Sequence, residues 1–238
     1  MSVEAILITG VGKRAGLHLA RTFLGRGLAV IGTYRTERPS LQVLKQQGAE
    51  LYKCDFNDEQ QVDLLIGNIK LKHVSLRAVI HNASDWLPDD AEIPAPEILQ
   101  RMMQVHVSVP YQLNLAFAPL LQATQHEHAD IVHVGDFVSS KGSKKHIAYA
   151  ASKAAQDCLT MSFSAKLSPK VKVNSVAPAL IMFNENDSKV YRERTLNKSL
   201  MKREAGLDEF SHAIDYLLDS SYVTGRVLPL DGGRHLVQ

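Results

Sequence analysis

The chain has 238 residues, 45% of them hydrophobic, and carries a formal charge of +2, with a pI near 8.5. This length suits one α/β domain over residues 1–238, and the charge is too small to predict a nucleic-acid partner. With only Cys54 and Cys158, no targeting segment and no apolar stretch of membrane-spanning length, we expect a cytoplasmic protein without disulfides or a membrane partner.

Short apolar runs alternate with longer amphipathic stretches along the chain. The predicted strands are 5–9, 29–34, 50–53, 78–81, 131–135, 171–177 and 227–230; the predicted helices are 16–26, 58–69, 98–124, 149–167 and 207–220. Strands of near-continuous apolarity are typical of parallel sheets covered on both faces. The alternation predicts an α/β fold with a Rossmann-type, doubly wound, seven-stranded parallel sheet in a three-layer sandwich. The polar stretch 180–205 is predicted to be an irregular substrate-binding loop.

A glycine-rich turn, Thr9-Gly10-Val11-Gly12-Lys13-Arg14-Ala15-Gly16, follows the first predicted strand and opens a helix. Glycines at such a turn let the backbone approach a pyrophosphate, and the helix N-terminus presents unpaired N–H groups. Ordinary strand-to-helix turns also use glycine, so the turn alone does not decide between the two interpretations.

The second predicted strand ends at Tyr34-Arg35-Thr36, where an acidic side chain would favour NAD. Arg35 can instead bind a 2′-phosphate, with Lys13 and Arg14 adding positive charge, which favours NADPH. A solvated loop arginine is the alternative. Asp55 and Asn82-Ala83-Ser84 follow the next two strands, at the edge of the sheet where cofactor sites gather.

Tyr149 and Lys153 lie four residues apart on a predicted helix. This spacing places the phenol and the ammonium on one face, where the positive charge is predicted to lower the pKa of Tyr149. Lys153 could also hold the nicotinamide ribose. Tyrosine and lysine occur at this spacing by chance in many helices, so the pair depends on its context.

Together, Thr9-Gly10 with Gly16, Asn82-Ala83, Tyr149-x-x-x-Lys153, Asn174-Ser-Val-Ala-Pro178, Thr224-Gly225 and Asp231-Gly232-Gly233 resemble the short-chain dehydrogenase/reductase signature. Within that superfamily the chain is most similar to the pteridine reductases, because Arg14 stands in the glycine turn and Asp136 replaces the usual catalytic serine. The resemblance implies transfer of hydride from NADPH to C6 of a 7,8-dihydropterin, with a proton added at N5.

The resemblance also implies the site residues. The catalytic residues would be Tyr149, Lys153 and Asp136. The cofactor would be bound by Gly10, Lys13, Arg14, Ala15, Gly16, Tyr34, Arg35, Thr36, Asp55, Phe56, Asn82, Ala83, Ser84, Tyr149, Lys153, Pro178, Leu180 and Ile181. The substrate would be bound by Arg14, Ser84, Trp86, Asp136, Tyr149, Leu180 and Phe183. A homodimer or homotetramer through the two long helices is also implied.

Several residues leave alternatives open. His106 stands where many family members have an asparagine that completes a proton relay, and Ala179 stands where glycine is usual. Trp86 could stack on a pterin, fill the core or contact another subunit. His126 and His128, near Asp130, have metal-ligand spacing but follow a helix end, and no metal site is expected.

Two other functions compete with pterin reduction. A carbonyl reductase acting on a 3-oxoacyl thioester or a sugar ketone is one, although Asp136 argues against it. A catalytically silent NADPH-binding regulator is the other, although Tyr149 and Lys153 are both present.

Overall fold

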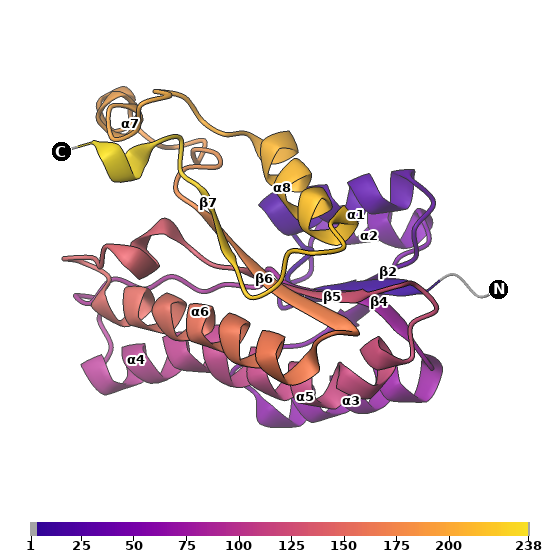
Figure 1. The fold of residues 1–238 in the computed structure, drawn as a ribbon. Coiled ribbons are helices and arrows are strands. Elements are labelled where there is room, and N and C mark those ends of the chain that lie inside the picture. Colours follow the sequence, from indigo (N-terminus) through magenta and orange to yellow (C-terminus); the bar gives the residue numbers. More distant parts are fainter. Residues whose placement is uncertain (1–3, 238) are drawn as a thin grey trace.

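The computed structural model describes residues 4–237 and contains one seven-stranded parallel sheet in the order β3-β2-β1-β4-β5-β6-β7. The predicted Rossmann-type α/β fold is confirmed (Figure 1). The strands are β1 (Ala5–Ile8), β2 (Val30–Tyr34), β3 (Glu50–Lys53), β4 (Leu76–His81), β5 (Ala129–Val134), β6 (Val171–Pro178) and β7 (Val227–Leu230). The expected cytoplasmic location was based partly on the N-terminal segment, and residues 1–3 of that segment lie outside the described residues.

Two helix layers cover the sheet, as Figure 1 shows. On one face lie α3 (Glu59–Lys72), α4 (Ala95–Met103), α5 (Val109–Gln122) and α6 (Ile147–Leu167). On the other lie α1 (Arg14–Gly25), α2 (Pro39–Gln46) and α8 (Leu207–Asp219). Each face has its own apolar core, one around Phe117 and Phe163 and the other around Phe23 and Phe210. Within residues 4–237, no helix has the length and apolarity needed to cross a membrane.

The predicted helix 98–124 is interrupted, which corrects the sequence interpretation. A π-helical turn, Gln104–Ser108, separates α4 from α5. Pro110 stands just after this turn. Proline lacks the N–H that would bond to the carbonyl of His106, four residues earlier, and its ring crowds that carbonyl. The backbone hydrogen bonds of the helix therefore widen for one turn, and His106 lies in this turn.

Two helices were not predicted. The loop 180–205 contains α7 (Lys189–Leu196), which begins where the Ser188 side chain accepts from the backbone N–H of Tyr191. This helix is polar on nearly all sides, so it has no apolar stripe to predict it. α2 spans only eight residues after Arg38, which is too short for a clear period.

The strand order reverses between β1 and β4. In an open parallel sheet, the helices that follow these two strands leave in opposite directions, which opens a crevice at the carboxyl ends. The glycine turn after β1 and the Asn82 segment after β4 therefore face each other across this crevice.

Candidate active site

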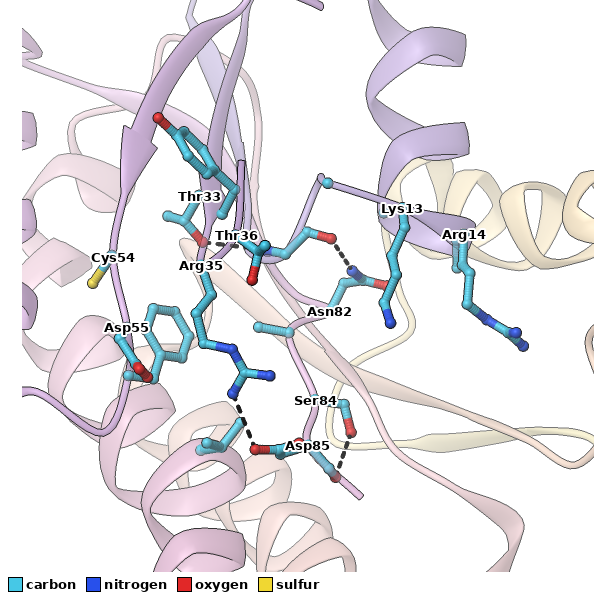
Figure 2. Close-up of a pocket in the computed structure, with 18 of the residues that line it drawn as sticks. Lys13, Arg14, Thr33, Arg35, Thr36, Cys54, Asp55, Asn82, Ser84 and Asp85 are labelled. Carbon is cyan, nitrogen blue, oxygen red and sulfur yellow. Dashed lines mark hydrogen bonds and ion pairs between the residues drawn. The ribbon is translucent and has the colours of Figure 1, made fainter. Parts of the chain in front are cut away.

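A cleft of about 380 Å³ opens at this reversal point. It is lined from the ends of β1, β2, β3 and β4, and Figure 2 shows the side chains that meet there. Most of the predicted cofactor residues line it: Gly10, Lys13, Arg14, Ala15, Gly16, Tyr34, Arg35, Thr36, Asp55, Phe56, Asn82, Ala83 and Ser84. Sequence reasoning missed Gly12, Thr33, Arg38, Cys54, Asp85 and Val105. All but Arg38 and Val105 adjoin predicted residues in sequence, so the same strand ends could have indicated them.

Backbone contacts fix the floor of the cleft. Gly10 has φ +75°, and a Cβ there would lie 2.9 Å from the Cα of Ala83. A Cβ on Gly16 would lie 2.2 Å from the carbonyl oxygen of Gly10. The Asn82 side chain donates to the carbonyls of Thr9 and Gly10, at 2.9 and 3.1 Å. Glycine is therefore required at both positions, and the start of α1 lies directly against the turn.

Arg35 reaches across the cleft. Its Nη1 lies 3.1 Å from Oδ2 of Asp85, so the guanidinium forms an ion pair with the opposite wall (Figure 2). Both side chains are partly exposed, at 53% and 24%. Arg38 lines the same end, with its Cδ 3.6 Å from the position of a Cβ on Gly12. The end of β2 therefore presents two guanidinium groups to the cleft.

Arg14 joins the glycine turn to the loop after β6. Its backbone has φ 51°, a left-handed conformation that costs energy for a residue with a Cβ. Its guanidinium donates to the Asn184 side chain and, at 3.1 Å, to the carbonyl of Met182. In this structure the loop holds the Arg14 side chain at the edge of the cleft.

Tyr149 and Asp136 form a hydrogen-bonded pair. The Tyr149 hydroxyl donates to Oδ2 of Asp136 at 2.8 Å, and Oδ1 of Asp136 accepts from the backbone N–H of Val138 at 2.9 Å. Tyr149 is buried, and burial raises the pKa of Asp136. The structure thus brings these two predicted residues together as a buried acid pair, from α6 and the end of β5.

Lys153 does not have the predicted effect on Tyr149. Burial, followed by the charge of Asp136, raises the pKa of Tyr149, and the hydrogen bond that the phenol donates to the Asp136 carboxylate also favours the protonated phenol. Nζ of Lys153 donates to the carbonyl of Val134 at 2.7 Å and to Gln156 at 3.3 Å. Burial lowers the pKa of Lys153 to about 8. The expectation of a lowered tyrosine pKa was wrong, because burial and the charge of Asp136 outweigh the effect of the lysine.

His106 is fully buried, and its ring meets the Tyr149 ring edge-on with centroids 5.4 Å apart. Its Nε2 lies 2.8 Å from Oγ of Ser84, and its Nδ1 lies 2.8 Å from Oγ of Ser152. Burial, together with the charge of Lys153, lowers the pKa of His106 well below its usual value. The ring is therefore neutral at physiological pH.

Trp86 is 58% exposed and lines the cleft, so it does not fill the core. Its ring lies against that of His146 at a tilt, with centroids 4.0 Å apart. His146 precedes α6, in a segment where Lys141, Lys144 and Lys145 are exposed, and it is partly covered by Trp86.

The remaining predicted residues lie elsewhere. Leu180 lines a second cavity of about 230 Å³, between the loop after β6 and the C-terminal segment. Phe183 is buried within the loop, under the guanidinium of Arg192 at 5.0 Å. Residues that do not line the first cleft are Tyr149, Lys153, Asp136, Pro178, Leu180, Ile181 and Phe183. Asp130, considered with the two histidines as a metal group, binds Lys172 at 2.6 Å.

Comparisons with known proteins agree with this architecture. The family described as enoyl-(acyl carrier protein) reductase matches residues 10–235. The chain is 49% identical over 231 residues to dihydromonapterin reductase of Klebsiella pneumoniae subsp. pneumoniae, covering 97% of this chain and 96% of the relative. Dihydromonapterin reductase of Escherichia coli O6:K15:H31 shows the same identity and coverage.

Solved structures support the fold. The FolM alternative dihydrofolate reductase 1 of Brucella canis, complexed with NADP, superposes with a TM-score of 0.87 at 22% identity, covering 99% of this chain and 95% of that one. A short-chain dehydrogenase/reductase mutant from Serratia marcescens gives 0.85 at 21% identity, covering 97% of each chain. On the 49% identity to dihydromonapterin reductases over 97% of its length, the chain belongs to the dihydromonapterin reductase family of short-chain dehydrogenase/reductase oxidoreductases.

Proposed function

We propose that this protein reduces 7,8-dihydromonapterin to tetrahydromonapterin with NADPH, and that dihydrofolate is a slower second substrate. The observation that carries the proposal is the Tyr149–Asp136 hydrogen bond of 2.8 Å. It places an acid pair at the position where a serine would suit the reduction of a carbonyl substrate. Relatives named dihydromonapterin reductase at 49% identity support the same reaction.

The cleft fits a dinucleotide. The N-cap residue of α1, Lys13, makes no side-chain capping hydrogen bond, so backbone N–H groups at the start of the helix are available to a pyrophosphate. Arg35 and Arg38 would hold the 2′-phosphate, and Asp55, Phe56 and Ala83 would surround the adenine. NADPH, when bound, supplies the hydride. Lys153, Pro178, Leu180 and Ile181 are proposed to contact its nicotinamide end.

The Tyr149–Asp136 pair would supply the proton that N5 of the pterin gains. Reduction at C6 leaves N5 in need of a proton, and Tyr149 carries one that it already shares with Asp136. Burial raises the pKa of both Tyr149 and Asp136, so the pair holds its shared proton more tightly than either group would in water. Lys153, with a pKa near 8, would balance the negative charge left behind.

The pterin ring would lie against Trp86, which offers its exposed face to the cleft. Ser84 and Arg14 would meet the polar edges of the ring, and Leu180 and Phe183 would contact it from the loop 180–205. That loop would also distinguish the short polyol tail of dihydromonapterin from the larger tail of dihydrofolate.

The alternatives predict different outcomes. A carbonyl reductase needs a donor that polarises a ketone, whereas an ionised Asp136 can only accept. A silent NADPH-binding regulator needs no acid at Tyr149. Both remain weaker readings of the site for these reasons.

Exposed apolar side chains on α4, α5 and α6, the helices within the two predicted long segments, support an oligomer. Leu99 and Tyr111 are 46% and 48% exposed, and Met161 on α6 is 55% exposed. A homodimer or homotetramer through these helices would cover them, and a monomeric mass by light scattering would contradict it. The cytoplasmic location stays a prediction from the sequence.

The test is NADPH oxidation followed by absorbance, with dihydromonapterin, dihydrofolate and a 3-oxoacyl thioester in parallel. We expect turnover of the two pterins only, fastest with dihydromonapterin, and a loss of at least about tenfold in Asp136→Ser. Turnover of the thioester alone would establish the carbonyl reductase. NADPH binding without any turnover would establish the silent binder.

A further inference from the structure

The fully buried His106 connects the cleft to the catalytic helix. Its ring bonds Ser84 on one side and Ser152 on the other, each at 2.8 Å. The Ser152 hydroxyl in turn donates to the backbone carbonyl of Tyr149 at 2.7 Å. A continuous chain of short hydrogen bonds thus runs from a side chain that lines the cleft to the first turn of α6.

The directions of these bonds follow from counting protons. Ser152 has one hydroxyl proton, and it is given to Tyr149, so Nδ1 of His106 must carry the proton that it shares with Ser152. A neutral imidazole has only one N–H, which leaves Nε2 as an acceptor for Ser84. The other tautomer would leave one of the two short contacts of Ser152 without a proton.

The Ser84 hydroxyl therefore donates its hydrogen bond to Nε2 of His106. Its longer contact with the carbonyl of Asp85 (Figure 2), at 3.3 Å, competes poorly with the 2.8 Å bond to His106. What the Ser84 hydroxyl has left for the cleft is its lone pairs. It can accept a hydrogen bond there but has no proton to donate.

We propose that His106 is a positioning residue that makes Ser84 an obligate hydrogen-bond acceptor for an N–H group of the substrate. The inference rests on the proposed function, because a dihydropterin carries several N–H donors around its ring. The carbonyl group of a ketone or thioester carries none. The His106–Ser84 pair thus favours the pterin class and disfavours groups that need a donor from the protein.

The experiment compares two substitutions that keep different halves of the imidazole. The amide of His106→Asn reaches the place of Nδ1 but not Ser84, whereas that of His106→Gln reaches the place of Nε2. We expect His106→Asn to raise KM for dihydromonapterin about 3- to 10-fold, with the NADPH Kd unchanged by fluorescence titration. His106→Gln should restore most of the loss. Ser84→Ala should reproduce it and add nothing further in the double variant.

Several outcomes would overturn the inference. Equal losses of kcat and Tm in both His106 variants would show a packing role only. A weaker NADPH Kd at constant KM would place the Ser84 acceptor on the cofactor. If the His106 variants do not fold, Ser84→Ala is compared with Ser84→Thr, which keeps the hydroxyl, and equal KM values would contradict the role. A wild-type protein that reduces no pterin refutes the proposed function instead, whatever the variants do.

Discussion

The two halves of the site are built in different ways. The cofactor cleft consists largely of backbone turns at strand ends, with Gly10, Gly16 and Asn82 in mutual contact within a short stretch of the sheet edge. The acid half consists of buried side chains from separate elements, where Tyr149, Asp136 and His106 meet only after α5 and α6 pack. A local motif can specify the first half, whereas burial sets the chemistry of the second.

Removing the phenolic hydroxyl should break the acid half alone. We expect Tyr149→Phe to lower kcat about 100- to 10,000-fold, because the proton donor is lost while the ring remains packed. The NADPH Kd, measured by fluorescence, should stay within about twofold. Tyr216→Phe, on an exposed tyrosine of α8, is the control. Residual activity above a tenth of wild type would show that another group supplies the proton.

Adding one methyl group should break the cofactor half alone. A Cβ at Gly16 would lie 2.2 Å from the Gly10 carbonyl, so Gly16→Ala must displace the turn. We expect NADPH affinity to fall at least about 100-fold, with a loss of several kcal/mol in stability by urea unfolding. Gly25→Ala adds the same methyl at the end of the same helix, with nothing within 4 Å, and should be neutral. Equal effects of the two changes would contradict the close-approach argument.

The side-chain half should also be the more sensitive to acid. His81 and His133 are buried beside Asn114 under the acid half, and burial lowers the pKa of His81 from 6.5 to about 4. The folded pKa lies below the unfolded one, so this stability is present above pH 6.5 and is lost as pH falls toward 4. We expect a loss of roughly 3 kcal/mol from His81 over that range, by urea unfolding. A stability that stays flat to pH 4.5 would contradict the burial of neutral histidines.

Charge at the end of β2 should govern the choice of cofactor. Arg35→Ala is expected to weaken NADPH binding about 10- to 100-fold and NADH binding little, because only NADPH has the 2′-phosphate. Arg101→Ala, which removes an exposed arginine paired with Glu97, is the matched control. Parallel losses for both cofactors would place Arg35 away from the phosphate.

The smallest expected effect comes from the partner of Arg35. Asp85 holds the guanidinium at 3.1 Å and would compete with the 2′-phosphate proposed to bind Arg35. Since exposed ion pairs contribute little, Asp85→Asn should tighten NADPH binding only about 2- to 5-fold, measured at low salt. Asp90→Asn removes the same charge from an exposed position and should leave the Kd unchanged. Weaker binding in Asp85→Asn would show that the ion pair helps to form the cleft.

Short-range patterns predicted the strand positions and the parallel sheet, and the family resemblance implied most of the residues that line the cleft. The apolar runs fix which segments form strands, and a glycine turn before a helix fixes its own geometry. The failures of the sequence predictions have physical causes as well. Pro110 produces a π-turn inside a continuous apolar pattern, and α7 is too polar to show a period.

By itself, the sequence determined the family and the fold. It also determined that Tyr149 and Lys153 lie on one face of a helix, since residues four apart are about one turn apart. Only the tertiary structure decided that Asp136 binds Tyr149, that the phenol keeps a raised pKa, and that His106 joins Ser84 to α6. Those properties arise from burial and from contacts between distant segments. No local pattern encodes them, because the same side chains in water would have their ordinary acidities and no fixed partners.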